Sequence, residues 1–342
     1  MSASASRPPL STSFSTPFSA PLWLKTGHLQ TAYTGLFWTP PPLPALQRWD
    51  IPVDAENENQ NKVRCLLNRA HDTPASVLVI LVHGLEGHAD VPYMVSTARK
   101  LLSQGLDVLR MNLRGCGQTQ HLSRTSYHAG LSGDLRAVAE YASEQLGYEQ
   151  IVLAGYSLGG HQVLKLATEW TSPPAWLKGM CAVSPPLDLA RTSHNLLRVE
   201  NRGYERYFFR LMLASYRARR RLWPEVTPLA PLARVHSLLD FDQYITGPQF
   251  GYRDAQDYYT QNSVGPHLGK ITLPVQIILA QDDPIVPFSC HQAVMGQAAP
   301  SVSWLLSREG GHVAFVNSPL AAKLDRDPMW SENRLLDFVA GV

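Results

Sequence analysis

The segment Ile151–Gly160 places a serine in a Gly-x-Ser-x-Gly pattern, Gly155-Tyr156-Ser157-Leu158-Gly159. A short apolar run before the pattern predicts a buried strand, and the apolar stretch that begins near Leu158 predicts a helix. Between such elements a serine stands exposed on a strained turn, where its hydroxyl can attack a carbonyl carbon. Glycines two residues on either side let the strand and the helix approach closely. The segment therefore predicts that Ser157 is a nucleophile, and a tight turn with an incidental serine is the alternative.

A serine hydroxyl needs a histidine to accept its proton and an acid to orient that histidine. In a sheet of this kind the acid follows the serine along the chain, in a loop after a strand. Asp282-Asp283-Pro284 comes directly after the predicted strand Val275–Ala280. We favour Asp283, because the Asp-Pro-x-Val-Pro register places it at the end of the turn. Asp282 is the alternative, and otherwise a loop-capping or solvent-facing neighbour.

The predicted histidine is His312, in Glu309-Gly310-Gly311-His312 after the predicted strand Val302–Leu306. Glycines before a histidine allow its loop to come close to the serine. His291 is the nearest rival, but it falls on the predicted helix Ser289–Gln297, one element too early. The alternative for His312 is a core or helix-capping side chain.

Attack on a carbonyl also needs two backbone N–H groups that stabilise the negative oxygen. One is expected from Leu158, directly after the nucleophile. The other is expected in His83-Gly84-Leu85-Glu86-Gly87, after the predicted strand Val77–Val82, with Leu85 as the donor. The chain thus carries an oxyanion loop, a serine, an acid and a histidine in the order expected for a sheet of this kind. We therefore predict that Ser157, Asp283 and His312 form the catalytic triad.

Apolar runs alternate with helical stretches along most of the chain. The predicted strands are Arg48–Val53, Val63–Asn68, Val77–Val82, Leu106–Met111, Ile151–Ala154, Gly179–Val183, Val275–Ala280 and Val302–Leu306. The predicted helices are Tyr93–Gln104, Leu131–Leu146, Leu158–Trp170, Ser289–Gln297 and Trp330–Phe338. Runs buried on both faces and separated by helices predict an α/β fold, with a mostly parallel twisted sheet covered by helices on both faces. The polar stretch 55–61 predicts a hairpin loop between the first two strands.

The alternation stops between Ser184 and Lys270 and then resumes. This break predicts a helical cap at residues 185–270, an α/β core at 48–184 and 271–342, and an N-terminal arm at 1–47 that packs on the core. The cap segment from Arg191 to Arg221 interleaves nine arginines with aromatic and apolar residues. We interpret it as a helix with an apolar underside and solvated arginines. The alternative is that these arginines attract the phosphates of acyl thioesters or the anionic headgroups of a membrane surface.

Composition excludes several classes of protein. A formal net charge of +2, with 44% hydrophobic and 17% charged residues, indicates a soluble globular protein with a substantial core and argues against nucleic-acid binding. No stretch reaches the roughly 18 to 20 apolar residues that span a bilayer. The N-terminus has no acidic residue before Asp50, but its prolines and its lack of an apolar segment argue against a targeting peptide. We expect a cytoplasmic protein.

The four cysteines are far apart and have no zinc-like spacing. Cys65 and Cys181 lie in apolar runs and are expected to be buried thiols in a reducing compartment. Cys116 follows Arg114-Gly115 in what we interpret as a structural loop. His121 and His128 have no metal-ligand spacing with carboxylates, and the chain has no glycine-rich phosphate loop. We therefore expect chemistry that uses neither a metal nor a cofactor.

With these residues in place, the chain resembles the α/β-hydrolase superfamily, and within it the type 4 family of YheT-like hydrolases and mammalian ABHD-type lipases. The matching segments are Gly27-His28-Leu29-Gln30-Thr31, His83-Gly84-Leu85-Glu86-Gly87, Met111-Asn112-Leu113-Arg114-Gly115-Cys116, Tyr127-His128-Ala129-Gly130, Gly155-Tyr156-Ser157-Leu158-Gly159-Gly160 and Asp282-Asp283-Pro284. The resemblance implies a carboxylesterase, lipase or acyltransferase with the triad Ser157, Asp283 and His312. His161 departs from the pattern, which has asparagine after Gly-Gly; we expect it to affect packing and not to relay protons.

The sequence thus predicts an esterase that acts on short to medium acyl esters, small molecules or acyl lipids, through an acyl-enzyme intermediate. One alternative is an acyltransferase, which passes the acyl group to an alcohol instead of water. The other is a ligand-binding protein on the same scaffold, in which the catalytic residues are vestigial. Exclusion of water by the cap would favour transfer, and covalent labelling of Ser157 would argue against a binding protein.

Overall fold

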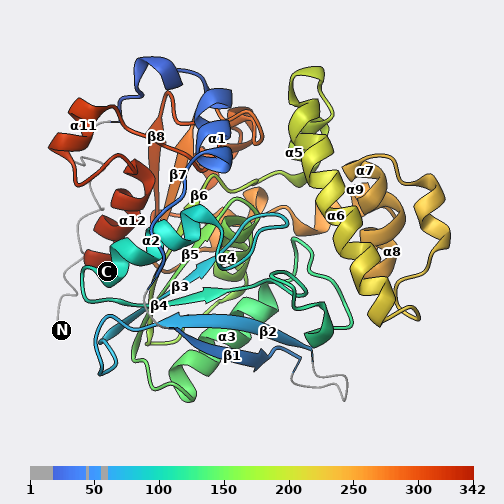
Figure 1. The fold of residues 1–342 in the computed structure, drawn as a ribbon, viewed down its shortest axis with the longest axis horizontal. Coiled ribbons are helices and arrows are strands. Elements are labelled where there is room, and N and C mark those ends of the chain that lie inside the picture. Colours follow the sequence, from blue (N-terminus) through green and yellow to red (C-terminus); the bar gives the residue numbers. More distant parts are fainter. Residues whose placement is uncertain (1–17, 44–45, 55–60) are drawn as a thin grey trace, which may run out of the picture.

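A computed structural model describes residues 18–43, 46–54 and 61–342. Eight strands form one sheet in the order β1-β2-β4-β3-β5-β6-β7-β8 (Figure 1). Strand β2 pairs antiparallel with β1 and β4, and the remaining neighbours are parallel, which confirms the predicted mostly parallel sheet. The strands are β1 (Gln47–Pro52), β2 (Lys62–Asn68), β3 (Val77–Val82), β4 (Asp107–Met111), β5 (Gln150–Tyr156), β6 (Leu177–Val183), β7 (Val275–Ala280) and β8 (Val302–Ser307). Most of the hairpin loop predicted between β1 and β2 lies outside the described residues.

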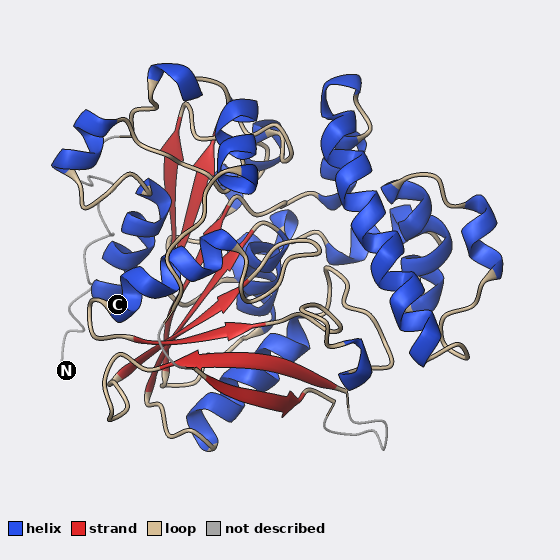
Figure 2. Ribbon diagram, in the orientation of Figure 1, coloured by secondary structure: helices blue, strands red, loops and turns tan. Residues whose placement is uncertain are grey.

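Helices cover both faces of the sheet (Figure 2). Alternate residues of β3 face opposite sides, so that Ile80 packs in the core beneath α3 (Ser132–Glu144) and α4 (Leu158–Glu169). Leu81 packs in a second core beneath α2 (Pro92–Leu102) and α12 (Trp330–Ala340). A strand that is buried on both faces is apolar at most positions, which explains the apolar runs in the sequence.

The chain between β6 and β7 is helical, and we call residues 184–274 the insertion. Figure 1 shows its helices grouped beside the sheet. They are α5 (Leu189–Leu196), α6 (Arg202–Leu222), α7 (Leu238–Phe241), α8 (Gly247–Gln249) and α9 (Ala255–Asn262), with a π-helical turn at Asp242–Thr246. Throughout the described part of the chain, every helix is too short or too polar to cross a membrane.

Three helical segments differ from the sequence-based expectation. Helices α1 (Gly27–Leu36) and α11 (Pro319–Leu324) were not predicted. The single helix expected at Ser289–Gln297 is wrong, because α10 (Phe288–Gln292) is followed by a separate 3-10 turn at Met295–Gln297. The helix ends because Val294 has φ −120°, outside the helical range, and its N–H bonds to the carbonyl three residues earlier.

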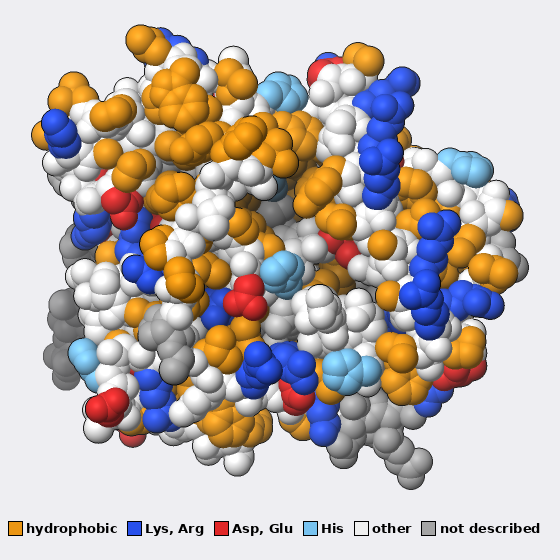
Figure 3. All heavy atoms as spheres, viewed as in Figure 1, with side chains coloured by type: hydrophobic (Ala, Val, Ile, Leu, Met, Phe, Trp, Pro, Cys, Tyr) orange, Lys and Arg blue, Asp and Glu red, His pale blue; other side chains and the backbone are white. Residues whose placement is uncertain are grey.

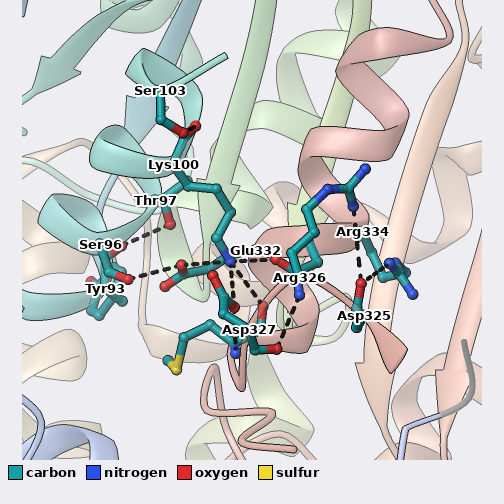
Figure 4. Close-up of polar contacts among 12 residues, drawn as sticks. Tyr93, Ser96, Thr97, Lys100, Ser103, Asp325, Arg326, Asp327, Glu332 and Arg334 are labelled. Carbon is teal, nitrogen blue, oxygen red and sulfur yellow. Dashed lines mark hydrogen bonds and ion pairs between the residues drawn. The ribbon is translucent and has the colours of Figure 1, made fainter. Parts of the chain in front are cut away.

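A network of charged side chains, with the Glu332 carboxylate buried at its centre, links α2 to α12 (Figure 4). Lys100 Nζ lies 2.9 Å from Asp327 Oδ1 and 3.3 Å from Glu332 Oε2. Ser96 Oγ donates a hydrogen bond of 2.8 Å to the same Glu332 oxygen. The Glu332 side chain is 2% exposed, and burial raises the pKa of its carboxyl to about 7. Lys100 therefore supplies the positive charge that offsets the desolvation cost of the buried Glu332 carboxylate between these two helices.

Replacing this lysine should destabilise the fold in a pH-dependent way. The pKa of Glu332 is raised in the folded state. The contribution of Glu332 to folding stability is therefore fully present at low pH, where its carboxyl is protonated, and is lost as the pH rises through about 7. In Lys100→Met the carboxylate loses its cation, so we expect a loss of about 3 kcal/mol at pH 8 and clearly less at pH 6, where Glu332 can be protonated. Urea unfolding at both pH values measures this difference.

The double variant Lys100→Met/Glu332→Gln is the matched control. It removes both charges, so it should recover most of the stability at pH 8. An equal loss at pH 6 and pH 8 in Lys100→Met would contradict the assignment of the effect to Glu332.

Candidate active site

Ser157 lies on the sharp turn between β5 and α4, as the sequence predicted. Its backbone has φ 53° and ψ −120°, a conformation that side chains other than glycine rarely adopt. The turn is held on both sides: the Ser157 N–H donates to Val183 O (2.8 Å), and the Ser157 carbonyl accepts from the His161 N–H (2.9 Å). The surrounding structure thus maintains a strained residue, as is common where a side chain must be presented for chemistry.

The two glycines of the pattern are required by close backbone contacts. A Cβ on Gly155 would lie 2.3 Å from Gly159 O, and one on Gly159 would lie 2.4 Å from Val82 O. Both distances are far shorter than atoms can tolerate, and backbone atoms cannot move aside easily. Helix α4 therefore begins directly against β5 and β3, which leaves Ser157 at the rim of the sheet.

His312 joins Ser157 to Asp283. Its Nε2 lies 2.8 Å from Ser157 Oγ, and its Nδ1 lies 2.7 Å from Asp283 Oδ2. The other oxygen of Asp283 accepts the N–H groups of Ile285 (2.8 Å) and Val286 (2.9 Å), which fixes the carboxylate. Because a carboxylate accepts at Nδ1, that nitrogen carries the proton and Nε2 is left to accept one from the serine.

The two adjacent aspartates contact different groups. Asp283, the residue that we favoured, faces the His312 ring, whereas Asp282 Oδ1 accepts the N–H of Gly311 (2.9 Å). Burial raises the pKa of the Asp282 carboxyl. Asp282 thus occupies the loop-capping position that we gave as its alternative role, and it holds the residue directly before His312.

Side chains of helix α1 form hydrogen bonds with the loop that carries His312. Thr31 Oγ1 accepts the His312 N–H (2.8 Å) and donates to Gly27 O (2.7 Å). The Gln30 amide accepts the Val316 N–H (2.8 Å) and donates to Val316 O (3.1 Å). In the sequence this segment carries only the family resemblance, and its positioning role was not predicted.

The fit between α1 and the two loops leaves no space for side chains. A Cβ on Gly27 would lie 1.9 Å from Asp282 O, and one on Gly311 would lie 2.5 Å from Gly27 O. Gly311 also has φ +63°, which favours glycine for its own reason. The acid loop, the histidine loop and the N-terminal helix therefore pack as one unit.

A buried histidine fixes the loop after β3. His83 Nε2 accepts the Leu113 N–H (3.1 Å), so its Nδ1 carries the proton and donates to Gly84 O (2.7 Å). Burial lowers the pKa of His83 to about 4, which keeps the ring neutral near pH 7. Gly84 lies against the nucleophile, since a Cβ there would be 3.1 Å from Ser157 Cβ. This loop brings the predicted donor Leu85 to the site.

Ser157, Leu85 and Leu158 line one cavity between the sheet and the insertion. The two predicted oxyanion donors thus line the same cavity as Ser157. Most of its remaining wall is apolar and comes from the insertion and from the loop after β7. The apolar residues of this wall are Leu189, Leu196, Phe208, Met212, Tyr216, Leu238, Phe241, Ile285 and Val286.

The other candidate residues of the sequence, His161, His291 and Cys116, lie in buried surroundings that fit a role in packing. His161 is fully buried and bonds through Nδ1 to Pro186 O (2.8 Å), and burial lowers its pKa to about 4. This enclosed and neutral ring fits the packing role that we expected. His291, the rival of His312, bonds through Nε2 to Pro185 O (2.8 Å). Cys116 lines the cavity, but burial raises its thiol pKa well above the ordinary value, which keeps the thiol protonated.

Comparison with known proteins gives a consistent set of similarities. Residues 77–319 match the family model described as alpha/beta hydrolase fold. The chain is 32% identical to "Putative esterase YheT" of Escherichia coli K12, over 76% of this chain and 76% of that protein. It is 25% identical to mouse phospholipase ABHD3, over 73% of this chain and 61% of that protein. The Pyrococcus furiosus esterase Pf2001 has the same fold, with a TM-score of 0.54 and 16% identity over 88% of this chain and 98% of its own.

The contact between Thr31 and His312 can be tested without a substrate. Thr31→Val keeps the shape of the side chain but removes the oxygen that accepts the His312 N–H. We expect reaction of Ser157 with a fluorophosphonate probe to slow about 10-fold, because small displacements of reacting groups are costly. Thr34→Val is the matched control, since Thr34 Oγ1 lies on the same helix and bonds only to α1 carbonyls. Equal rates in wild type and Thr31→Val would show that α1 does not position the histidine.

Proposed function

The chain belongs to the α/β-hydrolase fold family, and we propose that it is a serine hydrolase that cleaves carboxylic esters with short to medium acyl chains. The observation that carries this proposal is the hydrogen-bonded series from Ser157 through His312 to Asp283. The names of the similar proteins, an esterase and a phospholipase, support ester cleavage as the chemistry. Leu85 and Leu158 are the proposed oxyanion donors, in line with their place in the cavity wall beside the nucleophile.

The first half-reaction forms an acyl-enzyme. Ser157 Oγ attacks the ester carbonyl carbon while His312 Nε2 accepts the hydroxyl proton, and Asp283 stabilises the resulting imidazolium. The N–H groups of Leu85 and Leu158 stabilise the negative carbonyl oxygen of the tetrahedral intermediate. When the bond to the alcohol oxygen breaks, Nε2 gives its proton to that oxygen and the alcohol leaves.

The second half-reaction restores the serine. A water molecule attacks the acyl carbon while His312 Nε2 accepts its proton, and the bond from the acyl carbon to Ser157 Oγ then breaks. Nε2 returns the proton to Oγ, and the carboxylic acid leaves. Every proton in this sequence moves between the chain, the substrate and water.

The cavity wall supports an acyl substrate. Ile285 and Val286, directly after the acid, cluster with Leu196 and Leu238 of the insertion. These side chains offer an apolar surface next to the catalytic histidine, where an acyl chain can leave water. We place the acyl group of the substrate against this cluster.

Labelling and turnover together test the proposed mechanism. We expect wild type to hydrolyse p-nitrophenyl butyrate and to react covalently with a fluorophosphonate, and Ser157→Ala to do neither. Asp283→Asn should lower kcat by about 10⁴-fold, because it favours the wrong histidine tautomer. Asp282→Asn is the matched control and should retain far more activity, since the Asp282 side chain bonds to the Gly311 N–H and not to the His312 ring.

Two results would argue against the proposal. Wild type that neither turns over esters nor reacts with the probe would favour a ligand-binding protein. An equal loss in Asp282→Asn and Asp283→Asn would show that the two carboxylates do not have separate roles.

We further propose that the substrate is reached at an anionic lipid surface. Five arginines are exposed along one side of α6, at positions 202, 206, 210, 217 and 221, and Figure 3 shows Lys and Arg side chains in a row there. The neighbouring arm exposes apolar side chains, including Leu22 (83% exposed), Trp23 (59%) and Phe37 (73%). His28 of α1 stacks on Tyr204 of α6, with ring centroids 5.7 Å apart, so the two surfaces adjoin. Basic and apolar groups side by side are typical of proteins that bind membrane interfaces.

Vesicle co-sedimentation tests this surface. We expect the protein to sediment with vesicles that contain phosphatidylglycerol, and to do so less at high salt, because screening weakens the attraction. The triple variant Arg202→Glu/Arg206→Glu/Arg210→Glu should lose this binding while keeping its melting temperature. Arg253→Glu, at an exposed site elsewhere on the insertion, is the control. Equal binding of wild type and the triple variant would contradict the proposal.

A further inference from the structure

One arginine of α6 lies inside the protein. Arg219 is 4% exposed and lines the cavity that contains Ser157. Its burial contradicts, at this position, the expectation that the arginines of this segment are solvated. Burial lowers its pKa to about 10, so the guanidinium still carries its charge near pH 7. The structure therefore encloses a cation in the wall of the candidate active site.

Arg219 has few partners for a buried cation. Among the described residues, its guanidinium makes one hydrogen bond, from Nη1 to Ser123 O, and no carboxylate lies within the 4.0 Å of an ion pair. Glu86 acts on it only as a more distant charge, and the Glu86 oxygens accept the hydroxyls of Tyr127 and Ser215. Removing a cation from water without a close counter-ion is costly.

The second arginine of the cavity shows the contrast. Arg114 donates Nε and Nη2 to the two oxygens of Asp134, both at 2.6 Å, and also pairs with Asp54. Its charge is fully compensated by the protein. Arg219 next to it lacks such compensation, which suits a group that a ligand is to neutralise.

The backbone is shaped to admit this guanidinium. A Cβ on Gly115 would lie 1.9 Å from Arg219 Nη2, and Gly115 has φ +74°. The Arg-Gly-Cys segment that follows β4 therefore leaves room for Arg219 at its glycine. This packing aligns the planar guanidinium and limits the positions that it can adopt.

The lining of the cavity changes from apolar to charged along α6. Phe208, Met212, Ser215 and Arg219 all line it, and their spacing places them on one face of the helix. Phe208 and Met212 pack on the apolar cluster of Ile285 and Val286, beside the acid. At the other end, Ser215 bonds to Glu86, which follows the oxyanion donor Leu85. With a rise of about 1.5 Å per residue, Phe208 and Arg219 are separated by ~16 Å along the helix, and Ser157 lines the same cavity.

We propose that Arg219 binds a phosphate group on the alcohol portion of the substrate. This inference rests on the proposed esterase function: the acyl chain occupies the apolar end, the ester carbonyl lies at Ser157, and the phosphate lies at Arg219. A guanidinium fork matches the oxygens of a phosphate or a carboxylate, and a phosphate carries the larger charge. The substrate class is an acyl ester of a phosphorylated alcohol, such as a monoacylglycerol phosphate.

Paired substrates test this assignment. We compare octanoyl-glycerol 3-phosphate with octanoyl-glycerol, which differ only in the phosphate, and use the ratio of their kcat/KM values as the readout. Wild type should prefer the phosphate ester, and Arg219→Gln should reduce this ratio by about 10- to 100-fold. Arg219→Lys, which keeps a charge but loses the fork, should fall between them. Arg198→Gln, on the exposed side of the insertion, should leave the ratio unchanged.

A ratio close to one in wild type, or the same ratio in wild type and Arg219→Gln, would overturn the proposal. If Arg219→Gln does not fold, Arg219→Lys provides the same comparison. A structural role of Arg219 would lower both kcat/KM values together and leave their ratio unchanged, and that result would also overturn it.

Binding without turnover separates this inference from the proposed function. We expect glycerol 3-phosphate to bind Ser157→Ala, measured by calorimetry, and to bind Ser157→Ala/Arg219→Lys more weakly. Glycerol should not bind detectably, and glycerate should bind more weakly than glycerol 3-phosphate. Tighter binding of glycerate, or equal affinity of the two variants for glycerol 3-phosphate, would contradict the phosphate site even if esters are cleaved. Phosphate binding without ester cleavage would instead reject the proposed reaction.

Discussion

The hydrogen bond from Ser157 Oγ to His312 Nε2 joins two loops that lie 155 residues apart in the chain, and the surrounding structure serves to maintain it. The serine side is fixed by the close packing of β5, α4 and β3, where Gly155 and Gly159 leave no free space. The histidine side is fixed by Asp283 on the ring and by Thr31 on the backbone. A bond of 2.8 Å between two loops survives thermal motion only when both loops are held this firmly.

Backbone strain gathers at the same place. Positive φ angles occur at Ser157 (53°) and, in the neighbouring loops, at Glu86 (53°), Ser184 (51°), Val313 (67°) and Phe315 (48°). A β-branched residue such as Val313 is especially unfavourable there. Each such residue costs on the order of 1–3 kcal/mol, which the packed core must offset. The sheet therefore acts as a rigid support whose stability holds unfavourable loop conformations around Ser157 and His312.

The parts of this arrangement that depend on local sequence could be predicted, and those that depend on distant contacts could not. Strands β3 and β7 match the prediction at both ends, because a strand buried on two faces has an unmistakable apolar run. Asp283 could be placed because it follows such a strand, and His312 because it follows the apolar residues of β8, a partly exposed strand at the edge of the sheet. The hydrogen bonding between α1 and the histidine loop could not be predicted, since the Thr31–His312 bond spans 281 residues and a threonine in a short helix gives no local signal. The early end of α10 was missed for a different reason, because the sequence pattern stays helical where the backbone of Val294 leaves the helical range.

Helix α6 shows how one sequence pattern can hide two kinds of residue. Taken together, the arginines of α6 suggest a solvated basic face. The helical period, however, places Arg219 on a different face from Arg217 and Arg221. Arg219 is two residues from both Arg217 and Arg221, and a step of about 200° turns it to the opposite side of the helix. That side continues the row of Met212 and Tyr216, which faces the cavity. A cation in an apolar row is too costly to be retained for packing alone, when a leucine or methionine would fill the same volume without a charge to desolvate. The position of Arg219 in the helical period is therefore the physical reason to assign it to the substrate and the outer arginines to the surface.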